Sequence, residues 1–409
     1  MLDADPAPSA SSVRMARGAT YLAFIGSGFA FASWASRIPQ VRDRLHLSPS
    51  QLGLVLLAIA VGSVLALPLS GPMIARLGSR LTLQLMAALH GVGLVVVAVG
   101  FLAGVPPVLV GLFLSGFAIG AWDVAMNVQG AEVERHLGRS IMPRFHAGYS
   151  IGTVGGALVG SAVVALHIPV TPHLLVVGLA VATVVPLGVR AFLPDHPPGT
   201  TADAVDGVAT PSRQGTAART WAAWTERRTL LIGVFVLAFA FAEGTANDWI
   251  GVAVIDGYGT SPAVGTLGFA VFLAAMTLGR WFGPGLLDRY GRVRVVRGLG
   301  VVALAGLIAF VSGVNLVVAF AGAALWGVGV SLGFPVGMSA GADDPRRAAA
   351  RVSVISSIGY CAFLAGPPLV GLLGQHAGVL HAQTAVAVLL AVAALVAGAV
   401  RPPAPDAGS

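Results

Sequence analysis

A chain of 409 residues that is 56% hydrophobic and only 10% charged has too little polar surface to cover the core of a soluble protein. Its net charge of +7 comes from 24 basic residues, all arginine, in short gaps between apolar runs. No continuous basic face with interleaved aromatic residues is present, which excludes a nucleic-acid-binding protein. Apolar runs of about 20 residues, each long enough to cross a bilayer as a helix, recur throughout and predict an all-α membrane protein.

Twelve of these runs are predicted to span the membrane. In chain order they cover residues 18–38, 50–74, 81–103, 107–131, 145–167, 172–193, 229–253, 262–285, 295–314, 316–341, 352–373 and 380–400. The segment between the sixth and seventh runs is rich in Pro, Gly, Ser, Thr and Asp, which is typical of a solvated linker. We therefore expect a disordered cytoplasmic N-terminus, a six-helix bundle, a cytoplasmic linker, a second six-helix bundle and a cytoplasmic tail, over residues 1–16, 17–193, 194–228, 229–400 and 401–409.

The arginines at the span ends predict the orientation. With the N-terminus in the cytoplasm, nearly all of them lie in cytoplasmic segments, as the positive-inside rule requires. The exception is the first outside loop, which holds Arg37, Arg42 and Arg44. Both termini and the linker are therefore expected inside the cell.

The two halves share a short motif. GPMIARLGSR (71–80) follows the second span and GPGLLDRYGRVR (283–294) follows the eighth, so that Arg76 and Gly78 recur 213 residues later as Arg289 and Gly291. A duplicated six-span unit is typical of transporters built from two parallel repeats, with the substrate site near the middle of the membrane. The candidate residues of these two loops are Gly71, Arg76, Gly78, Arg80, Asp288, Arg289, Gly291 and Arg292.

Together, the twelve spans, the central linker and the two G-x-x-x-D-R-x-G-R-like loops resemble the major facilitator superfamily over about residues 17–400. The first loop has Ala75 where the family usually has Asp, and the second has Pro284 in place of the leading Gly. Three further stretches are similar to a bacterial subgroup near the fucose-permease branch: SWASRIPQVRDRLHLS (33–48), WDVAMNVQG (122–130) and FHAGYSIG (145–152). The resemblance implies two pseudo-symmetric six-helix bundles in the bacterial inner membrane, with a gating role for the two loops.

Polar residues inside the spans are the candidate site. In the fourth span, Asp123 and Asn127 share one helical face with several glycines, and Gln129 follows closely. Asp123 is either a protonatable or substrate-binding carboxylate on a water-filled pathway, or a structural acid paired with a loop arginine such as Arg144. Proton-coupled sugar symporters of the resembled branch carry an acid on helix 4, which favours the first interpretation.

The seventh span contains a second group. Glu243 and Asn247 are one helical turn apart, whereas Asp248 is about 140° around the helix from Glu243. We predict that Glu243 and Asn247 face the pathway and keep Asp248 as a further candidate. A buried structural acid is the alternative.

Three more residues complete the candidates. Trp34 and Arg37 are predicted to share a face of the first span. Arg37 could hold an anionic substrate, pair with Glu243 or Asp248, or extend to the interface as a snorkelling arginine. Arg280 in the eighth span could pair with a membrane acid or belong to the helix packing.

The sequence thus predicts a secondary active transporter, monomeric in the bilayer, that moves a small polar solute such as a sugar or an organic metabolite by alternating access, with protons as the coupling ion. A proton-linked exporter of amphiphilic compounds and a non-transporting membrane sensor are the alternatives. No catalytic cluster, metal-ligand spacing or phosphate-binding loop stands out, so we expect no enzyme, no cofactor and no metal.

Overall fold

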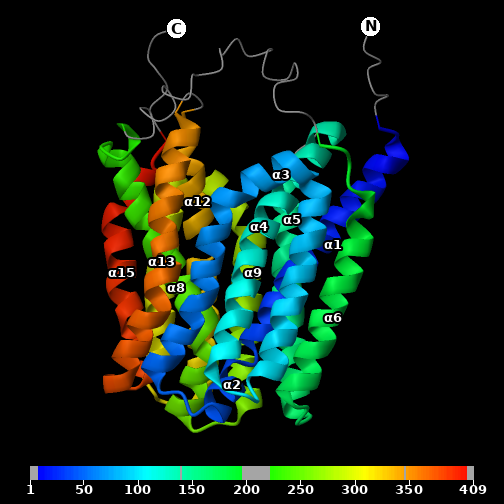
Figure 1. The fold of residues 1–409 in the computed structure, drawn as a ribbon. Helices are drawn as coiled ribbons and strands as arrows, with labels where there is room; N and C mark the ends of the chain where they lie inside the picture. Colours follow the sequence, from blue (N-terminus) through cyan, green and yellow to red (C-terminus); the bar gives the residue numbers. More distant parts are fainter. Residues whose placement is uncertain (1–7, 139–140, 196–221, 345–346, 403–409) are drawn as a thin grey trace, which may run out of the picture. The chain divides into compact units, whose positions relative to one another are not determined.

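The computed structural model describes residues 8–138, 141–195, 222–344 and 347–402 (Figure 1). Ten helical segments in this part are long and apolar enough to cross a membrane. One of them, α3, contains two of the predicted spans, and α1 supplies the remaining one, so helices correspond to all twelve predicted spans. The expectations for residues 1–7, most of the linker and residues 403–409 fall outside the described residues.

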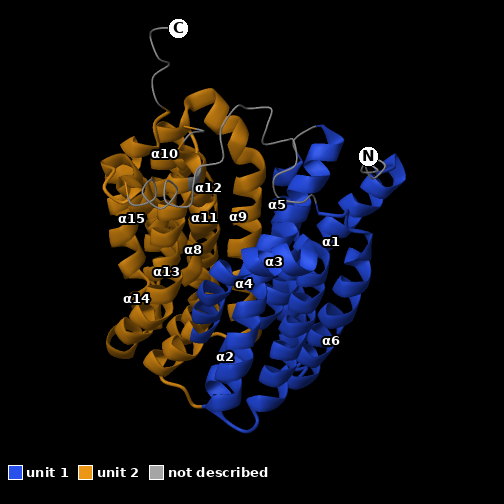
Figure 2. Cartoon of the chain, turned by 45° about the horizontal axis from the view of Figure 1, so that its top comes forward, with its two compact units in different colours: residues 1–45, 58–200 blue, residues 46–57, 201–409 orange. Residues whose placement is uncertain are grey.

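The chain divides into two compact units (Figure 2). The first comprises residues 1–45 and 58–200, and the second comprises residues 46–57 and 201–409. The first residues of α3, which the sequence assigns to the first bundle, group with the second unit. The reason is local packing: Gly53 of α3 meets the backbone of Pro367 so closely that a Cβ would collide with it.

The helices of the first unit follow one another with short connections. They are α1 (Ala10–Ala35), α2 (Ile38–Arg44), α3 (Pro49–Gly100, which begins in the second unit), α4 (Val105–Leu137), α5 (Met142–Ala165), α6 (Val170–Gly188) and the 3-10 turn η1 (Val189–Ala191). Helix α1 begins earlier than predicted, since the Ser9 side chain accepts a hydrogen bond from the Ser12 N–H and caps it. Residues 10–16 are therefore helical, and their prediction as disordered was wrong.

Close backbone contact joins α1 to α5. A Cβ on Gly28 would collide with the backbone of Tyr149, and a Cβ on Gly152 would collide with that of Ile25. Small residues at these crossings let helices approach where no hydrophobic effect drives association, as is usual inside a bilayer.

The second unit contains the remaining helices. They are α8 (Arg227–Tyr258), α9 (Pro262–Tyr290), α10 (Arg292–Val311), α11 (Leu316–Val330), α12 (Gly333–Gly341), α13 (Ala348–Ala377), α14 (Val379–Ala382), α15 (Thr384–Val396) and the 3-10 turn η2 (Ala397–Val400). Helix α8 packs against α9, α13 and α15 and buries Trp249 completely. The predicted tenth span is not one helix, because it breaks between α11 and α12 at Ser331 and Leu332.

The backbone confirms the internal repeat. Gly78 inside α3 has φ 79° and ψ 160°, and Gly291 between α9 and α10 has φ 78° and ψ 155°. An L-residue with a side chain rarely adopts this conformation, so both loops need glycine at the same place. The sequence motif and the turn geometry thus recur together.

Candidate functional site

Asp123 and Asn127 lie together on α4, as predicted. The Asn127 side-chain amide donates to the Asp123 carbonyl oxygen at 2.8 Å and to its carboxylate Oδ1 at 3.3 Å. Both residues are partly exposed within the chain. The alternative partner Arg144 forms no ion pair with Asp123, which has no cationic partner among the described residues.

Glu243 is held by an arginine. Both Nη2 hydrogen bonds of Arg280 reach its carboxylate, at 2.9 and 2.8 Å, and join α8 to α9. The Arg280 Nε donates to the Ser331 carbonyl at 3.3 Å, at the break between α11 and α12. The interpretation of Arg280 as the partner of a membrane acid is confirmed, and Glu243 is therefore a neutralised carboxylate.

Asn247 and Asp248 follow Glu243 on α8, four and five residues later. The Asn247 Oδ1 is buried and accepts no hydrogen bond within the described chain. Asp248 is partly exposed and likewise has no hydrogen bond or ion pair there. The expected grouping of Glu243 with Asn247 thus differs from the observed contacts, in which Glu243 turns to Arg280.

Arg37 has a partner that the sequence did not suggest. It lies in the turn after α1, only 1% exposed, and its Nε donates to Nδ1 of His173 at 2.9 Å. Its Nη2 donates to the Ile168 carbonyl at 3.0 Å. Arg37 pairs with neither Glu243 nor Asp248, and it does not snorkel. It instead fixes the turn beside the buried Trp34 to the start of α6.

Gln129 lies away from Asp123 and is fully buried. Its Nε2 donates to Ser79 Oγ at 3.1 Å and to the Leu193 carbonyl at 2.9 Å, while its Oε1 accepts from the Leu193 N–H at 3.0 Å. These bonds satisfy the whole amide group. The prediction that Gln129 lines the solute pathway is therefore not supported by its contacts, since the side chain instead holds the end of the sixth span.

The first motif loop is tied to the same segment. Asp195 accepts hydrogen bonds from the N–H of Ser79 and, at 2.5 Å, from its Oγ, directly after the turn at Gly78. This carboxylate caps the second half of α3 at its positive end. Arg80 donates to the Phe192 carbonyl at 3.1 Å. Gly71 and Arg76 make no such contact within the described residues.

The second motif loop is tied by charge. Arg292 donates to Asp343 Oδ1 at 2.6 Å and to Ser339 Oγ at 3.0 Å, and Arg228 binds Asp343 Oδ2 at 2.7 Å. Arg289 lies 5.2 Å from the centroid of the Tyr290 ring, a cation–π distance. The predicted loop residue Asp288 is exposed and forms no ion pair in the described part.

Sequence reasoning missed four residues that bind helix ends and loops to neighbouring segments. They are Asp195, His173, Asp343 and Glu226, the last of which receives two hydrogen bonds from Arg351. Asp195 and Glu226 fell within the segment predicted as a linker. The acids at the ends of neighbouring apolar runs, beside arginines, were the available signal for Asp343 and Glu226. Nothing in the sequence pairs His173 with Arg37 over 136 positions.

Two helical units with a duplicated loop, a broken tenth span and few intramembrane charges are features of a polytopic membrane transporter. The sequence profile of the Major Facilitator Superfamily matches residues 20–361. An uncharacterized MFS-type transporter of Yersinia pestis is 32% identical over 384 residues, which are 93% of this chain and 94% of that protein. The chain belongs to the major facilitator superfamily and is a transporter, not an enzyme.

Solved structures share the fold at low identity. A crystal structure of the nucleoside transporter NupG superposes with a TM-score of 0.70 at 16% identity, covering 95% of this chain and 98% of that one. The fucose:proton symporter FucP of E. coli gives 0.58 at 15% identity, with coverage of 95% and 98%. This agrees with the resemblance to the fucose-permease branch in fold, and identities this low support the fold alone.

Proposed function

We propose that this transporter is a proton-coupled secondary active transporter that moves a small, neutral, polar solute across the bacterial inner membrane. Transport proceeds by alternating access, with both termini and the linker in the cytoplasm. The functional unit is a monomer, as each chain carries both repeats. The proposal rests on which of the three acids of α4 and α8 has a cationic partner.

Only one of these acids has a cation. Glu243 is neutralised by Arg280, whereas Asp123 and Asp248 have no cationic partner within the described residues. An ionised side chain at the bilayer centre costs at least ~2.5 kcal/mol, so an unpaired carboxylate sealed from water is favoured in its protonated form. The same carboxylate releases its proton when water reaches it. Asp123 and Asp248 are therefore the proposed proton carriers, in place of Glu243.

The solute class follows from the remaining polar groups. The Asn127 amide lies beside Asp123 and is partly exposed, and the Asn247 Oδ1, which is buried in this conformation, accepts no hydrogen bond in the described chain. Amides bind hydroxyl and amide groups, as on a sugar or a nucleoside-like ring. The two arginines that could have held an anion, Arg37 and Arg280, are engaged by His173 and Glu243. A neutral solute fits this arrangement better than a carboxylate or a phosphate.

The test is solute-driven proton movement. Purified protein is reconstituted in liposomes that contain the pH dye pyranine, and neutral sugars, polyols, nucleosides and carboxylates are added one at a time. We expect proton movement with a neutral solute. In Asp123→Asn and Asp248→Asn proton movement is lost, while exchange of labelled solute across the membrane persists. Asp43→Asn is the matched control, because Asp43 pairs with Arg42 outside the membrane spans and its side chain is 52% exposed.

Three outcomes would contradict the proposal. Full proton coupling in the double variant Asp123→Asn/Asp248→Asn would exclude these acids as carriers. Proton movement driven by amphiphilic cations such as ethidium, and by no neutral solute, would identify an exporter instead. A stable dimer in light scattering, together with transport activity in the dimer alone, would contradict the proposal that the functional unit is a monomer.

A further inference from the structure

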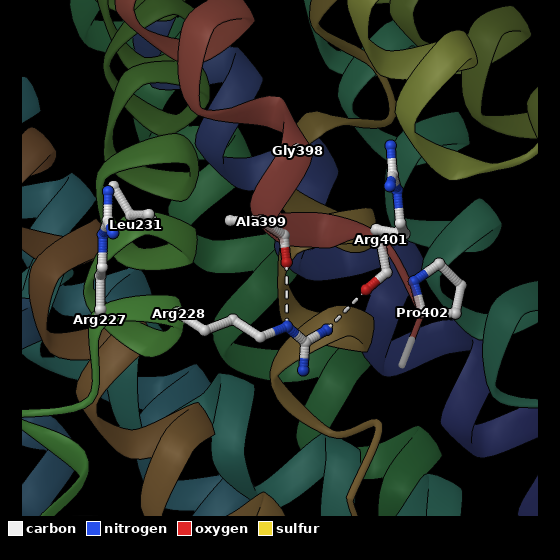
Figure 3. A pocket seen from close by; sticks show the side chains of 7 residues that line it. All are labelled: Arg227, Arg228, Leu231, Gly398, Ala399, Arg401 and Pro402. Atoms are coloured by element: carbon white, nitrogen blue, oxygen red, sulfur yellow. Dashed lines mark hydrogen bonds between the residues drawn. The ribbon is translucent and has the colours of Figure 1, made fainter. Parts of the chain in front are cut away.

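A pocket with three arginines lies where α8 begins and the chain leaves η2 (Figure 3). It has a volume of about 470 Å³ and belongs entirely to the second unit. Arg227, Arg228 and Arg401 line it together with Leu231, Ala399 and Pro402. None of its described lining residues is acidic, so these residues carry a net positive charge.

One of the three arginines builds the pocket. Arg228 donates from Nε to the Ala399 carbonyl at 3.1 Å and from Nη2 to the Arg401 carbonyl at 3.0 Å (Figure 3). It also binds Asp343 at 2.7 Å. These contacts satisfy its charge and hold the end of η2 against the start of α8.

The other two arginines of the pocket have no side-chain partner in the described chain. Arg227 and Arg401 are both exposed, and neither side chain makes a hydrogen bond or an ion pair within the described residues. In Figure 3, Arg227 lies beside Leu231 on α8, and Arg401 lies on the opposite side of the pocket. Two guanidinium groups without a counter-ion among the described residues line one pocket, which favours an anionic ligand, because guanidinium binds phosphate oxygens through paired hydrogen bonds.

The position of these arginines relative to the bilayer indicates the source of that anion. Arg227 is the first residue of the apolar span that ends at Tyr258, and Arg401 directly follows the span that ends at Val400. Both residues thus lie at the ends of segments that are apolar enough to cross a bilayer, and lipid phosphates are expected near such ends. The first N–H groups of the 32-residue helix α8 add partial positive charge beside Arg227.

We propose that Arg227 and Arg401 bind the phosphate of an anionic phospholipid in this pocket. The apolar side chains of Leu231 and Pro402 would contact its glycerol and upper acyl region. The lipid would bridge the beginning of α8 and the end of η2, beside the contact of Arg228 with Asp343. This inference is independent of the solute and of the coupling ion.

The test compares lipids on the full-length protein in neutral detergent. Native mass spectrometry measures binding of phosphatidylglycerol, of phosphatidylcholine as its neutral counterpart, and of inorganic phosphate. We expect phosphatidylglycerol to bind tightly, and roughly fivefold more weakly for each arginine removed in Arg227→Gln and Arg401→Gln. Because both side chains are exposed, these variants should unfold at the wild-type temperature in lipid-free detergent, which checks that they fold.

The control has the same change of net charge elsewhere. Arg190→Gln/Arg294→Gln removes two other exposed arginines near span ends, outside the pocket, and should leave phosphatidylglycerol binding unchanged. Equal loss in this control would show general attraction of anionic lipid to basic surface, and the site would be refuted. Unchanged binding in Arg227→Gln/Arg401→Gln would refute it too. Binding of inorganic phosphate with the same dependence on Arg227 and Arg401 would make the ligand a free anion and overturn the assignment to lipid.

Discussion

Arg280 of α9 clasps the carboxylate of Glu243 in α8 through two hydrogen bonds of 2.9 and 2.8 Å. The two side chains retain only 26% and 19% of their exposure, so the charges are partly removed from solvent. Because Arg280 also binds the Ser331 carbonyl, the pair connects α8 and α9 to the break in the tenth span. Broken helices of transporters expose carbonyls that need such partners.

Removing one member of this pair should destabilise the protein more than removing both. Glu243→Gln leaves Arg280 without its counter-ion, and Arg280→Gln leaves Glu243 without its counter-ion. Each substitution should lower the unfolding free energy by up to ~3 kcal/mol. The double variant carries no unpaired charge and should recover part of that loss. Thermal unfolding of the four proteins in detergent measures the coupling. Additive effects of the two substitutions would show that the observed contact contributes no energy.

The contact between Arg37 and His173 predicts a different pattern. His173→Ala removes the acceptor of the Arg37 Nε and leaves a buried donor unsatisfied, which should lower the unfolding free energy by about 1–3 kcal/mol. His173→Asn keeps a side-chain oxygen near the position of Nδ1 and should recover part of the loss. The measurement is again the unfolding temperature. If both variants are equally destabilised, the role of His173 is packing and not acceptance of this hydrogen bond.

The spans and the repeat could be predicted because both depend on the order of residues in short stretches of the sequence. Apolar runs give the helices, and the spacing of Arg76 and Gly78 from Arg289 and Gly291 gives the duplication. The pairings could not be predicted, since they depend on which faces meet in space. Glu243 turns toward Arg280 on the next helix, and Gln129 turns toward Leu193 rather than toward Asp123. Helical periodicity places a residue on a face but does not say which neighbour that face contacts.

The two loop glycines allow backbone strain and steric contact to be separated. Gly291→Ala places a Cβ on a residue with φ 78° where no atom of the described chain lies within 4 Å, so its cost of about 1–3 kcal/mol is that of the backbone alone. Gly78→Ala has the same backbone cost and also brings a Cβ to 3.1 Å from Asp195 Oδ2. It should therefore be the more destabilising of the two in thermal unfolding.

A helical glycine supplies the control for both. Gly298→Ala in α10 has open space and ordinary helical geometry, and should stabilise the protein by roughly 0.5–1 kcal/mol. Loss of stability in Gly298→Ala, or none in Gly291→Ala, would contradict the assigned cause.

Glu226 makes the stability of the second unit depend on pH. It precedes α8, and its hydrogen bonds from Arg351, together with that from Thr229, hold the pKa of its carboxyl below the usual range. The stabilisation is therefore complete above the unfolded pKa of about 4.3 and is lost as the pH falls through the lower folded value. Thermal unfolding between neutral and acidic pH should show a wild-type advantage over Glu226→Gln that is constant at neutral pH and shrinks in acid. Asp288→Asn, at an exposed carboxylate without an ion pair in the described part, should follow the wild-type curve. If the wild type stays more stable than Glu226→Gln by the same amount at low pH, the charge of Glu226 does not contribute to the stability that its contact with Arg351 provides.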